Sequence, residues 1–116
     1  MTIRIKRSYE VPDDADGLRI LVDRLWPRGI SKEQAKIDFW PKGIAPSNEL
    51  RRWYGHDPEK WTDFKKRYFA ELDDQPEQVE ELLGYLRKGN VTFVYSSTEQ
   101  RFNNALALKE YIESQT

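Results

Sequence analysis

The sequence contains no cysteine and a single histidine among its 116 residues. Without cysteine there is no disulfide framework, thiolate zinc site, thiol nucleophile or iron–sulfur cluster. One histidine excludes metal motifs that need two. No apolar run approaches the roughly 18 residues of a membrane span, and the opening segment MTIRIKRSYE does not resemble a signal peptide. We therefore expect a cytoplasmic protein with no metal, no cofactor and no membrane partner.

An excess of charge of one sign is also lacking. There are 19 basic and 20 acidic residues, which give a formal net charge of −1. No global field draws such a chain toward nucleic acid, so strong nucleic-acid binding is not expected. Charged residues nevertheless make up 34% of the chain and aromatic residues 13%. The length predicts one domain over residues 1–116, and the aromatics argue against disorder and predict a core rich in aromatic side chains.

The periodicity of apolar residues predicts an α/β fold. Residues 3–9 alternate apolar and polar side chains, 18–22 form a short β-branched run, and 91–95 (VTFVY) have the strongest strand pattern. Long helical connections favour parallel pairing. We therefore predict a single domain with a small, largely parallel sheet of about three to four strands covered by helices. Apolar stripes at helical spacing are Trp61, Phe64, Tyr68 and Leu72; Val79, Leu82, Leu83 and Leu86; and Phe102, Ala105, Leu108 and Ile112.

Capping residues mark several of the expected helix starts. Ser31 precedes one short helix, and Ser47 or Asn48 precedes another. Ser97 with Gln100 has the spacing of a capping box, which places the start of the last helix directly after the third strand.

Polar side chains follow two of the predicted strands. The segment 23–29 (DRLWPRG) follows one, and 96–98 (SST) follows the other, with Asn103 and Asn104 in the expected first turn of the last helix. In open parallel sheets, ligands bind beyond the carboxyl ends of the strands. We therefore predict one ligand site at this edge, which we call the rim site.

The residue types at the rim site indicate an anionic ligand. Arginines can clamp a phosphate or carboxylate through two parallel hydrogen bonds, and the expected helix N-terminus adds partial positive charge. Asp23 is the candidate catalytic acid or base. We predict a small phosphorylated or carboxylated ligand that is bound and, if the protein is an enzyme, processed there. The residues predicted to contact it are Arg24, Trp26, Arg28, Arg51, Ser96, Asn103 and Asn104.

Most of these residues also have a purely structural interpretation. Asp23 beside Arg24 can form an ion pair or fix a loop. Trp26 followed by proline can be a core anchor and a rigid turn, and residues 96–98 can be no more than a helix cap. One alternative is therefore a purely structural α/β module.

A second cluster, LRRWYGHDP at residues 50–58, supports another alternative. Its aromatics could form a stacking platform for a base, with Arg51 and Arg52 on phosphates. That would make the protein a nucleic-acid or protein interaction module using Arg51, Arg52 and Trp53. In the structural interpretation the aromatics pack in the core and His56 ends a helix.

Three strings carry a family resemblance: LVDRLWPRGISKE at 21–33, APSNELRRWYGHDPEKWTDFKKRY at 45–68 and VYSSTEQRFNNAL at 94–106. Together they resemble the bacterial domain of unknown function 488 (DUF488) family, in its short YeaO-like branch. The likeness covers nearly the whole chain. It implies a small, single-domain, cytosolic bacterial protein of the α/β class, and it carries no established activity.

The longer members of that family differ from this chain at both strand ends. They carry Asp-x-Arg-x-x-Pro at the first, whereas here the arginine follows Asp23 immediately. They carry Cys-x-Glu and Cys-His-Arg near the second, where Tyr95 and Ser97, then Asn103 and Asn104, stand here. The resemblance thus implies a binding site that persists without thiolate or imidazole chemistry.

Overall fold

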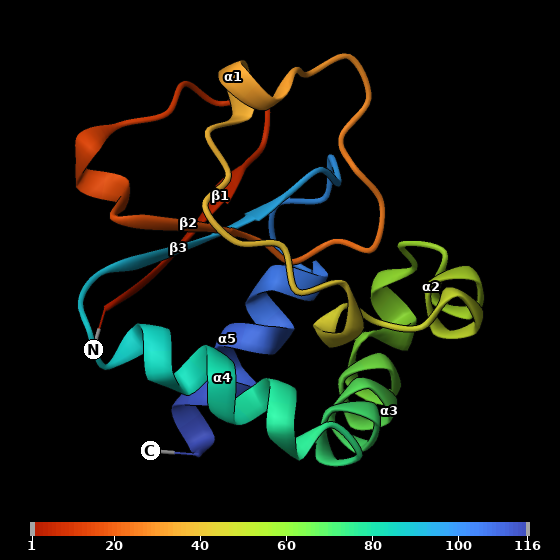
Figure 1. The fold of residues 1–116 in the computed structure, drawn as a ribbon. Coiled ribbons are helices and arrows are strands. Elements are labelled where there is room, and N and C mark those ends of the chain that lie inside the picture. Colours follow the sequence, from red (N-terminus) through yellow and green to blue (C-terminus); the bar gives the residue numbers. More distant parts are fainter. Residues whose placement is uncertain (1, 116) are drawn as a thin grey trace.

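A parallel three-stranded sheet lies at the centre of the molecule (Figure 1). In this computed structural model, which describes residues 2–115, β1 (Ile3–Arg7) and β2 (Leu18–Leu21) flank β3 (Val91–Tyr95) in the order β1-β3-β2. Ile3 and Leu18 are both in register with Val91. The predicted α/β class and parallel pairing are confirmed, although β1 ends two residues earlier than expected because a turn begins at Ser8.

Helices cover the sheet unequally. Figure 1 shows α3, α4 and α5 on one side of the sheet, with α5 packed on β1 and β3, whereas α1 and the segment 8–17 lie on the other side. No helix within residues 2–115 is both long and apolar enough to cross a membrane. The helices are α1 (Lys32–Ala35), α2 (Asn48–Tyr54), α3 (Trp61–Asp73), α4 (Pro76–Leu86) and α5 (Asn104–Ser114), with short 3-10 helices η1 (Asp14–Asp16), η2 (Lys42–Ile44) and η3 (Pro58–Lys60).

The predicted helical stripes form the core between the helices and the sheet. Phe64 and Tyr68 of α3 are buried, and Tyr54 of α2 stacks on Phe64 with ring centroids 4.3 Å apart. The buried Tyr68 hydroxyl donates to the Ile44 carbonyl at 2.7 Å. The four stripe residues of α4 are all aliphatic and buried. The core is therefore aromatic around α2 and α3, as the composition indicates, and aliphatic around α4.

The other face of the sheet carries a buried ionic network. Arg19 of β2 donates to Asp16 at 2.6 Å, and Lys6 of β1 lies 3.2 Å from the same carboxylate. The Thr92 hydroxyl of β3 donates to the Asp16 carbonyl at 2.7 Å. Burial raises the pKa of Asp16, but hydrogen bonds from the Asp13 N–H, Lys6 and Arg19 outweigh burial and hold it below its usual value. The network ties all three strands to η1.

Two helix starts match the predicted caps. The Ser31 hydroxyl accepts from the Gln34 N–H of α1, and the Ser47 hydroxyl accepts from the Leu50 N–H of α2. Ser47 also donates to Glu71 of α3 through its N–H at 2.9 Å and its hydroxyl at 2.6 Å. The start of α2 is therefore held against α3.

The last helix begins later than predicted, so Phe102 of the expected stripe lies before α5 and is only partly buried. Ser97 accepts from the Glu99 N–H inside a loop and does not form the expected capping box with Gln100. Instead, Asn103 is the N-cap of α5, and its side-chain oxygen accepts from the Leu106 N–H at 2.9 Å. Asparagine caps helices as well as serine does, so the chain can use Asn103 in place of the predicted Ser97.

Replacement of Gly17 by alanine should destabilise the protein strongly. Gly17 has φ +64°, and a Cβ there would overlap the Asn90 carbonyl where the entries to β2 and β3 meet. Gly29 is a matched control, because its φ is +74° and a Cβ there meets nothing within 4 Å. We expect Gly29→Ala to lose about 1 kcal/mol from backbone strain and Gly17→Ala to lose about 1–3 kcal/mol more from overpacking. Equal losses in urea unfolding would contradict the close approach.

Candidate rim site

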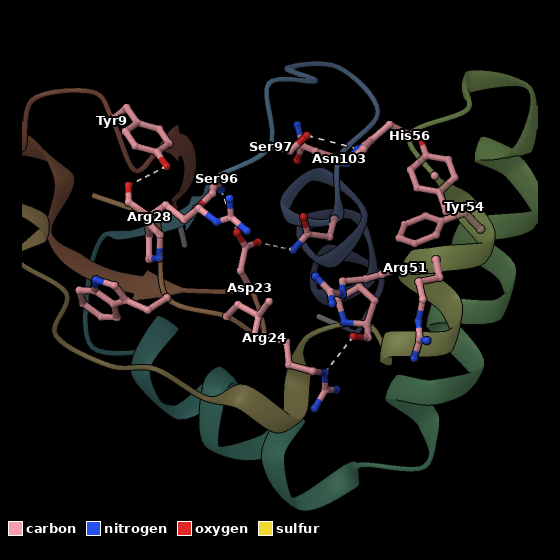
Figure 2. A pocket seen from close by; sticks show the side chains of 18 residues that line it. Tyr9, Asp23, Arg24, Arg28, Arg51, Tyr54, His56, Ser96, Ser97 and Asn103 are labelled. Carbon is pink, nitrogen blue, oxygen red and sulfur yellow. Dashed lines mark hydrogen bonds between the residues drawn. The ribbon is translucent and has the colours of Figure 1, made fainter. Parts of the chain in front are cut away.

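A cavity of about 500 Å³ opens at the carboxyl ends of the strands (Figure 2). Its walls come from the segments that follow β1, β2 and β3, from α2 with the turn after it, and from the start of α5. The structure brings every residue predicted for the rim site to this one cavity. These residues are Asp23, Arg24, Trp26, Arg28, Arg51, Ser96, Asn103 and Asn104.

Asp23 joins three elements at the cavity. One carboxylate oxygen accepts from the Ser96 N–H at 2.9 Å, and the other accepts from the Asn104 amide at 3.0 Å. The same amide donates to the Val22 carbonyl at 3.0 Å. Burial raises the pKa of Asp23 above its usual value, although the hydrogen bonds from Asn104 and Ser96 and the charge of Arg51 oppose the rise. Asp23 thus fixes the ends of β2 and β3 to the start of α5; its role as a catalytic acid or base stays a prediction.

Arg24 turns its guanidinium to the backbone rather than to Asp23. Its Nε donates to the Pro46 carbonyl at 3.2 Å and its Nη2 to the Ala45 carbonyl at 3.0 Å. These bonds hold the segment before α2 against the loop after β2. The fork that a bidentate anion clamp requires is therefore already occupied at Arg24.

Trp26 also has a structural role at the cavity wall. Its indole N–H donates to the Ile30 carbonyl at 2.7 Å, and its ring meets Trp40 edge-on with centroids 5.5 Å apart. Trp26 lines the cavity, so its ring is available for contact while its polar atom is not.

Among the arginines of the cavity, Arg28, Arg51 and Arg52 keep more of their N–H groups free of bonds to the described residues than Arg24 does, since Arg24 uses both Nε and Nη2. All three are exposed, and Figure 2 shows the Arg28 side chain extending into the cavity. Arg51 uses Nη2 to donate to the Asn48 side chain at 3.0 Å, and Arg52 uses Nε to donate to the Asn48 carbonyl at 3.3 Å. Arg28 and Arg51 therefore have more N–H groups available to a ligand than Arg24 has, and the predicted contact of these arginines with an anion stays a prediction.

Asn103 and Ser96 contribute mainly through bonds to the protein. Asn103 is only 2% exposed; its oxygen caps α5, and its amide nitrogen donates to the Glu99 carbonyl at 3.1 Å. The Ser96 hydroxyl lies 3.2 Å from the Ser8 hydroxyl. Both residues line the cavity, and their contact with a ligand stays a prediction.

The second cluster divides between the cavity and the core. His56 lines the cavity, with φ +58°, and its Nδ1 lies 3.4 Å from the Ser97 hydroxyl. Trp53 packs against the core, and Lys60 and Arg67 lie over its ring at 5.1 and 4.0 Å from the centroid. A base stacked on Trp53 would have to compete with these contacts.

Two apolar lining residues were not singled out from the sequence. Tyr9 follows β1 and is 49% exposed, and Leu25 follows β2 and is 61% exposed. The Tyr9 hydroxyl donates to the Arg28 carbonyl at 3.1 Å. The sequence could have indicated Tyr9, because it follows a strand of the parallel sheet. The carboxyl end of β1 must lie at the same edge of the sheet as the carboxyl ends of β2 and β3.

No group of three histidine, cysteine, aspartate or glutamate residues that could hold a metal ion occurs within residues 2–115. The fold and the site define a small α/β domain with an arginine-rich cavity at the carboxyl ends of parallel strands. The chain belongs to the DUF488-N3i family, described as the inactive DUF488-N3 subclade, whose model matches residues 2–116. The family resemblance seen in the sequence is thereby confirmed.

Two relatives illustrate the breadth of the match. The chain is 39% identical over 114 residues to the uncharacterized protein YeaO of Escherichia coli (strain K12), covering 98% of this chain and 99% of the relative. It is 50% identical over 72 residues to the uncharacterized protein Rv3073c of Mycobacterium tuberculosis (strain ATCC 25618 / H37Rv), covering 62% of this chain and 61% of the relative. No solved structure matches the chain.

The raised pKa of Asp23 predicts a specific dependence of stability on pH. Because the pKa of Asp23 in the folded protein lies above the ordinary value of 3.8, the folded protein binds the carboxyl proton more tightly than the unfolded chain does. The contribution of Asp23 to the free energy of unfolding is therefore fully present at lower pH and is lost as the pH rises through the folded value. We expect the stability of the wild type, relative to Asp23→Asn, to fall as the pH rises from about 4 to about 7. A relative stability that rises over that interval would contradict the raised pKa.

Asn103 should behave as a helix cap in a mutational series. We expect Asn103→Ser to retain the bond to the Leu106 N–H, and Asn103→Ala to lose about 1 kcal/mol more of the free energy of unfolding. Urea unfolding of both variants measures the difference. Equal stabilities would mean that capping is not the main contribution of this side chain.

Proposed function

We propose that the cavity at the carboxyl ends of the strands binds a small anionic ligand through a phosphate or carboxylate group and does not convert it chemically. The observation that carries the proposal is the set of charged side chains that meet there. Four arginines, Arg24, Arg28, Arg51 and Arg52, line the cavity together with a single carboxylate, Asp23.

This local excess of positive charge contrasts with the chain as a whole. The formal net charge of the sequence is −1, so the field at the cavity comes from the placement of these arginines and not from bulk composition. A concave site with walls of low dielectric strengthens such a field. Guanidinium groups with free N–H groups, as at Arg28 and Arg51, match the geometry of phosphate and carboxylate oxygens.

Binding without turnover is supported by the groups that the cavity lacks and by those already engaged. The sequence supplies no thiol. Both oxygens of Asp23 accept hydrogen bonds that hold the fold together. The hydrogen-bond partner of His56 Nδ1 is the Ser97 hydroxyl, and the Glu99 carboxylate interacts with His56 through charge alone. The description of the family as inactive points the same way. A cytoplasmic location and a small-molecule partner remain predictions.

The test is the binding of simple anions to the wild type and to arginine variants. We expect inorganic phosphate, phenyl phosphate or benzoate to bind in calorimetric titration and to raise the unfolding temperature. Loss of a charge-assisted hydrogen bond costs about 1.5–3 kcal/mol, so Arg28→Gln and Arg51→Gln should each weaken binding by roughly ten- to a hundredfold. Binding should also weaken as the salt concentration rises from about 0.1 to about 1 M, because the electrostatic screening length falls from about 10 to about 3 Å.

Arg87→Gln is the matched control. Arg87 forms an exposed ion pair with Glu80 of α4 and does not line the cavity, so its loss should leave anion binding unchanged. Equal weakening by Arg87→Gln would indicate non-specific charge attraction. If no anion binds the wild type, the proposal is wrong, and oligonucleotide titrations at two salt concentrations would then test the nucleic-acid interaction module, leaving a protein interaction module or a purely structural one if none binds.

A further inference from the structure

The carboxylate of Asp23 retains capacity for a hydrogen-bond donor from a ligand. Its oxygens accept hydrogen bonds from the Ser96 N–H and the Asn104 amide, and the Ser96 hydroxyl also acts on the carboxylate as a hydrogen-bond donor. An ionised carboxylate offers about four lone-pair positions, so at least one remains for a donor from a ligand. Figure 2 shows the Asp23 side chain directed into the cavity, with the Arg28 side chain extending in from one side.

Within residues 2–115, no cation forms a close ion pair with this carboxylate. The close ion pairs place Lys6 and Arg19 on Asp16, Lys65 on Glu110 and Arg87 on Glu80. Asp23 is not among them, and the neighbouring Arg24 is turned away to backbone carbonyls. A partly buried carboxylate that is held only by neutral donors gains most from a cation that enters the same space.

The cavity also has an apolar wall beside these charges. Leu25 and Tyr9 are 61% and 49% exposed, and both line the cavity together with Trp26 and Pro27. Large apolar side chains left open to water at the mouth of a cavity favour a ligand with an apolar body. A bare anion such as phosphate would leave this wall unused.

A carboxylate, free guanidinium groups and an apolar wall in one cavity match the three parts of an amino acid. We propose that the ligand is a zwitterion of the α-amino acid type with an apolar or aromatic side chain. Its ammonium group lies on Asp23, its carboxylate on Arg28 or Arg51, and its side chain against Leu25, Tyr9 and Trp26. This inference rests on the proposed anion binding and names the ligand class of the same site.

The experiment compares ligands that differ by one charged group on the wild-type protein. The probes are L-phenylalanine, N-acetyl-L-phenylalanine, which lacks the ammonium group, and 2-phenylethylamine, which lacks the carboxylate. In calorimetric titration we expect L-phenylalanine to bind at least about tenfold more tightly than either analogue, since pairing a charge at a desolvated site exceeds about 1.4 kcal/mol. These ligand-side comparisons do not depend on a variant that might not fold.

Two substitutions then assign the groups. In Asp23→Asn, L-phenylalanine and its N-acetyl derivative should bind equally, because the carboxylate that distinguishes them is gone. In Arg28→Gln, the binding of L-phenylalanine and of its N-acetyl derivative should both weaken, because both carry a carboxylate. The preference for the ligand with a free amine should persist. Circular dichroism and urea unfolding establish that each variant is folded, and the Arg87→Gln control should retain the wild-type preference.

The outcomes separate this inference from the function on which it rests. If N-acetyl-L-phenylalanine binds as tightly as L-phenylalanine, the zwitterion inference fails and anion binding stands. If phosphate or adenosine 5′-monophosphate binds and L-phenylalanine does not, the zwitterion inference again fails and anion binding again stands. Asp23 would then accept a hydrogen bond from a neutral donor of the ligand. If none of these anions binds, both proposals fail together.

Discussion

Strand β3 is hydrogen-bonded to a parallel neighbour along each edge, and all five of its residues are buried. That pairing makes the carboxyl ends of three strands meet at one edge of the sheet. Ser96, the first residue after β3, can then present its N–H to Asp23 after β2, and Asn104 at the start of α5 completes the contact. The walls formed by the segments after the strands and by the start of α5 follow from this junction. The wall formed by α2 is joined to it through Arg24, which holds the segment before α2.

The substitutions that set this chain apart from longer DUF488 members acquire a physical meaning at this junction. The family resemblance places Asn103 and Asn104 at the positions where those longer members carry cysteine and histidine. Here one amide caps α5 and the other binds the Asp23 carboxylate and the Val22 carbonyl. Two groups that could transfer a proton or attack a substrate are replaced by two that hold fixed hydrogen bonds.

Much of this arrangement could be predicted from the sequence, because it depends on local periodicity. The strand at 91–95, the stripe at Phe64 and Tyr68, and the gathering of polar strand ends at one edge all followed from spacing and chain direction. The start of α5 did not, because Ser97 and Asn103 are both good caps and only the path of the loop selects between them.

Which of the arginines bonds to the protein and which stays free could not be predicted from the sequence, for a different reason. Arg24 and Arg28 lie four positions apart in one loop, and nothing local distinguishes them. Arg24 is occupied because two carbonyls just before α2, some 20 residues later, approach it in space. Contacts between distant segments decide which side chain remains free, and such contacts depend on the packing of α2 against α3.

The distribution of tryptophans gives the cavity an intrinsic optical label. All four tryptophans of the chain fall between positions 26 and 61, yet only Trp26 among them lines the cavity, with Trp40 in edge contact behind it. Trp53 lies instead under the Lys60 and Arg67 side chains. A molecule that enters the cavity changes the polarity around one indole and leaves the environment of Trp53 intact. Shifts in ultraviolet emission of the unmodified chain therefore report on the occupancy of the cavity.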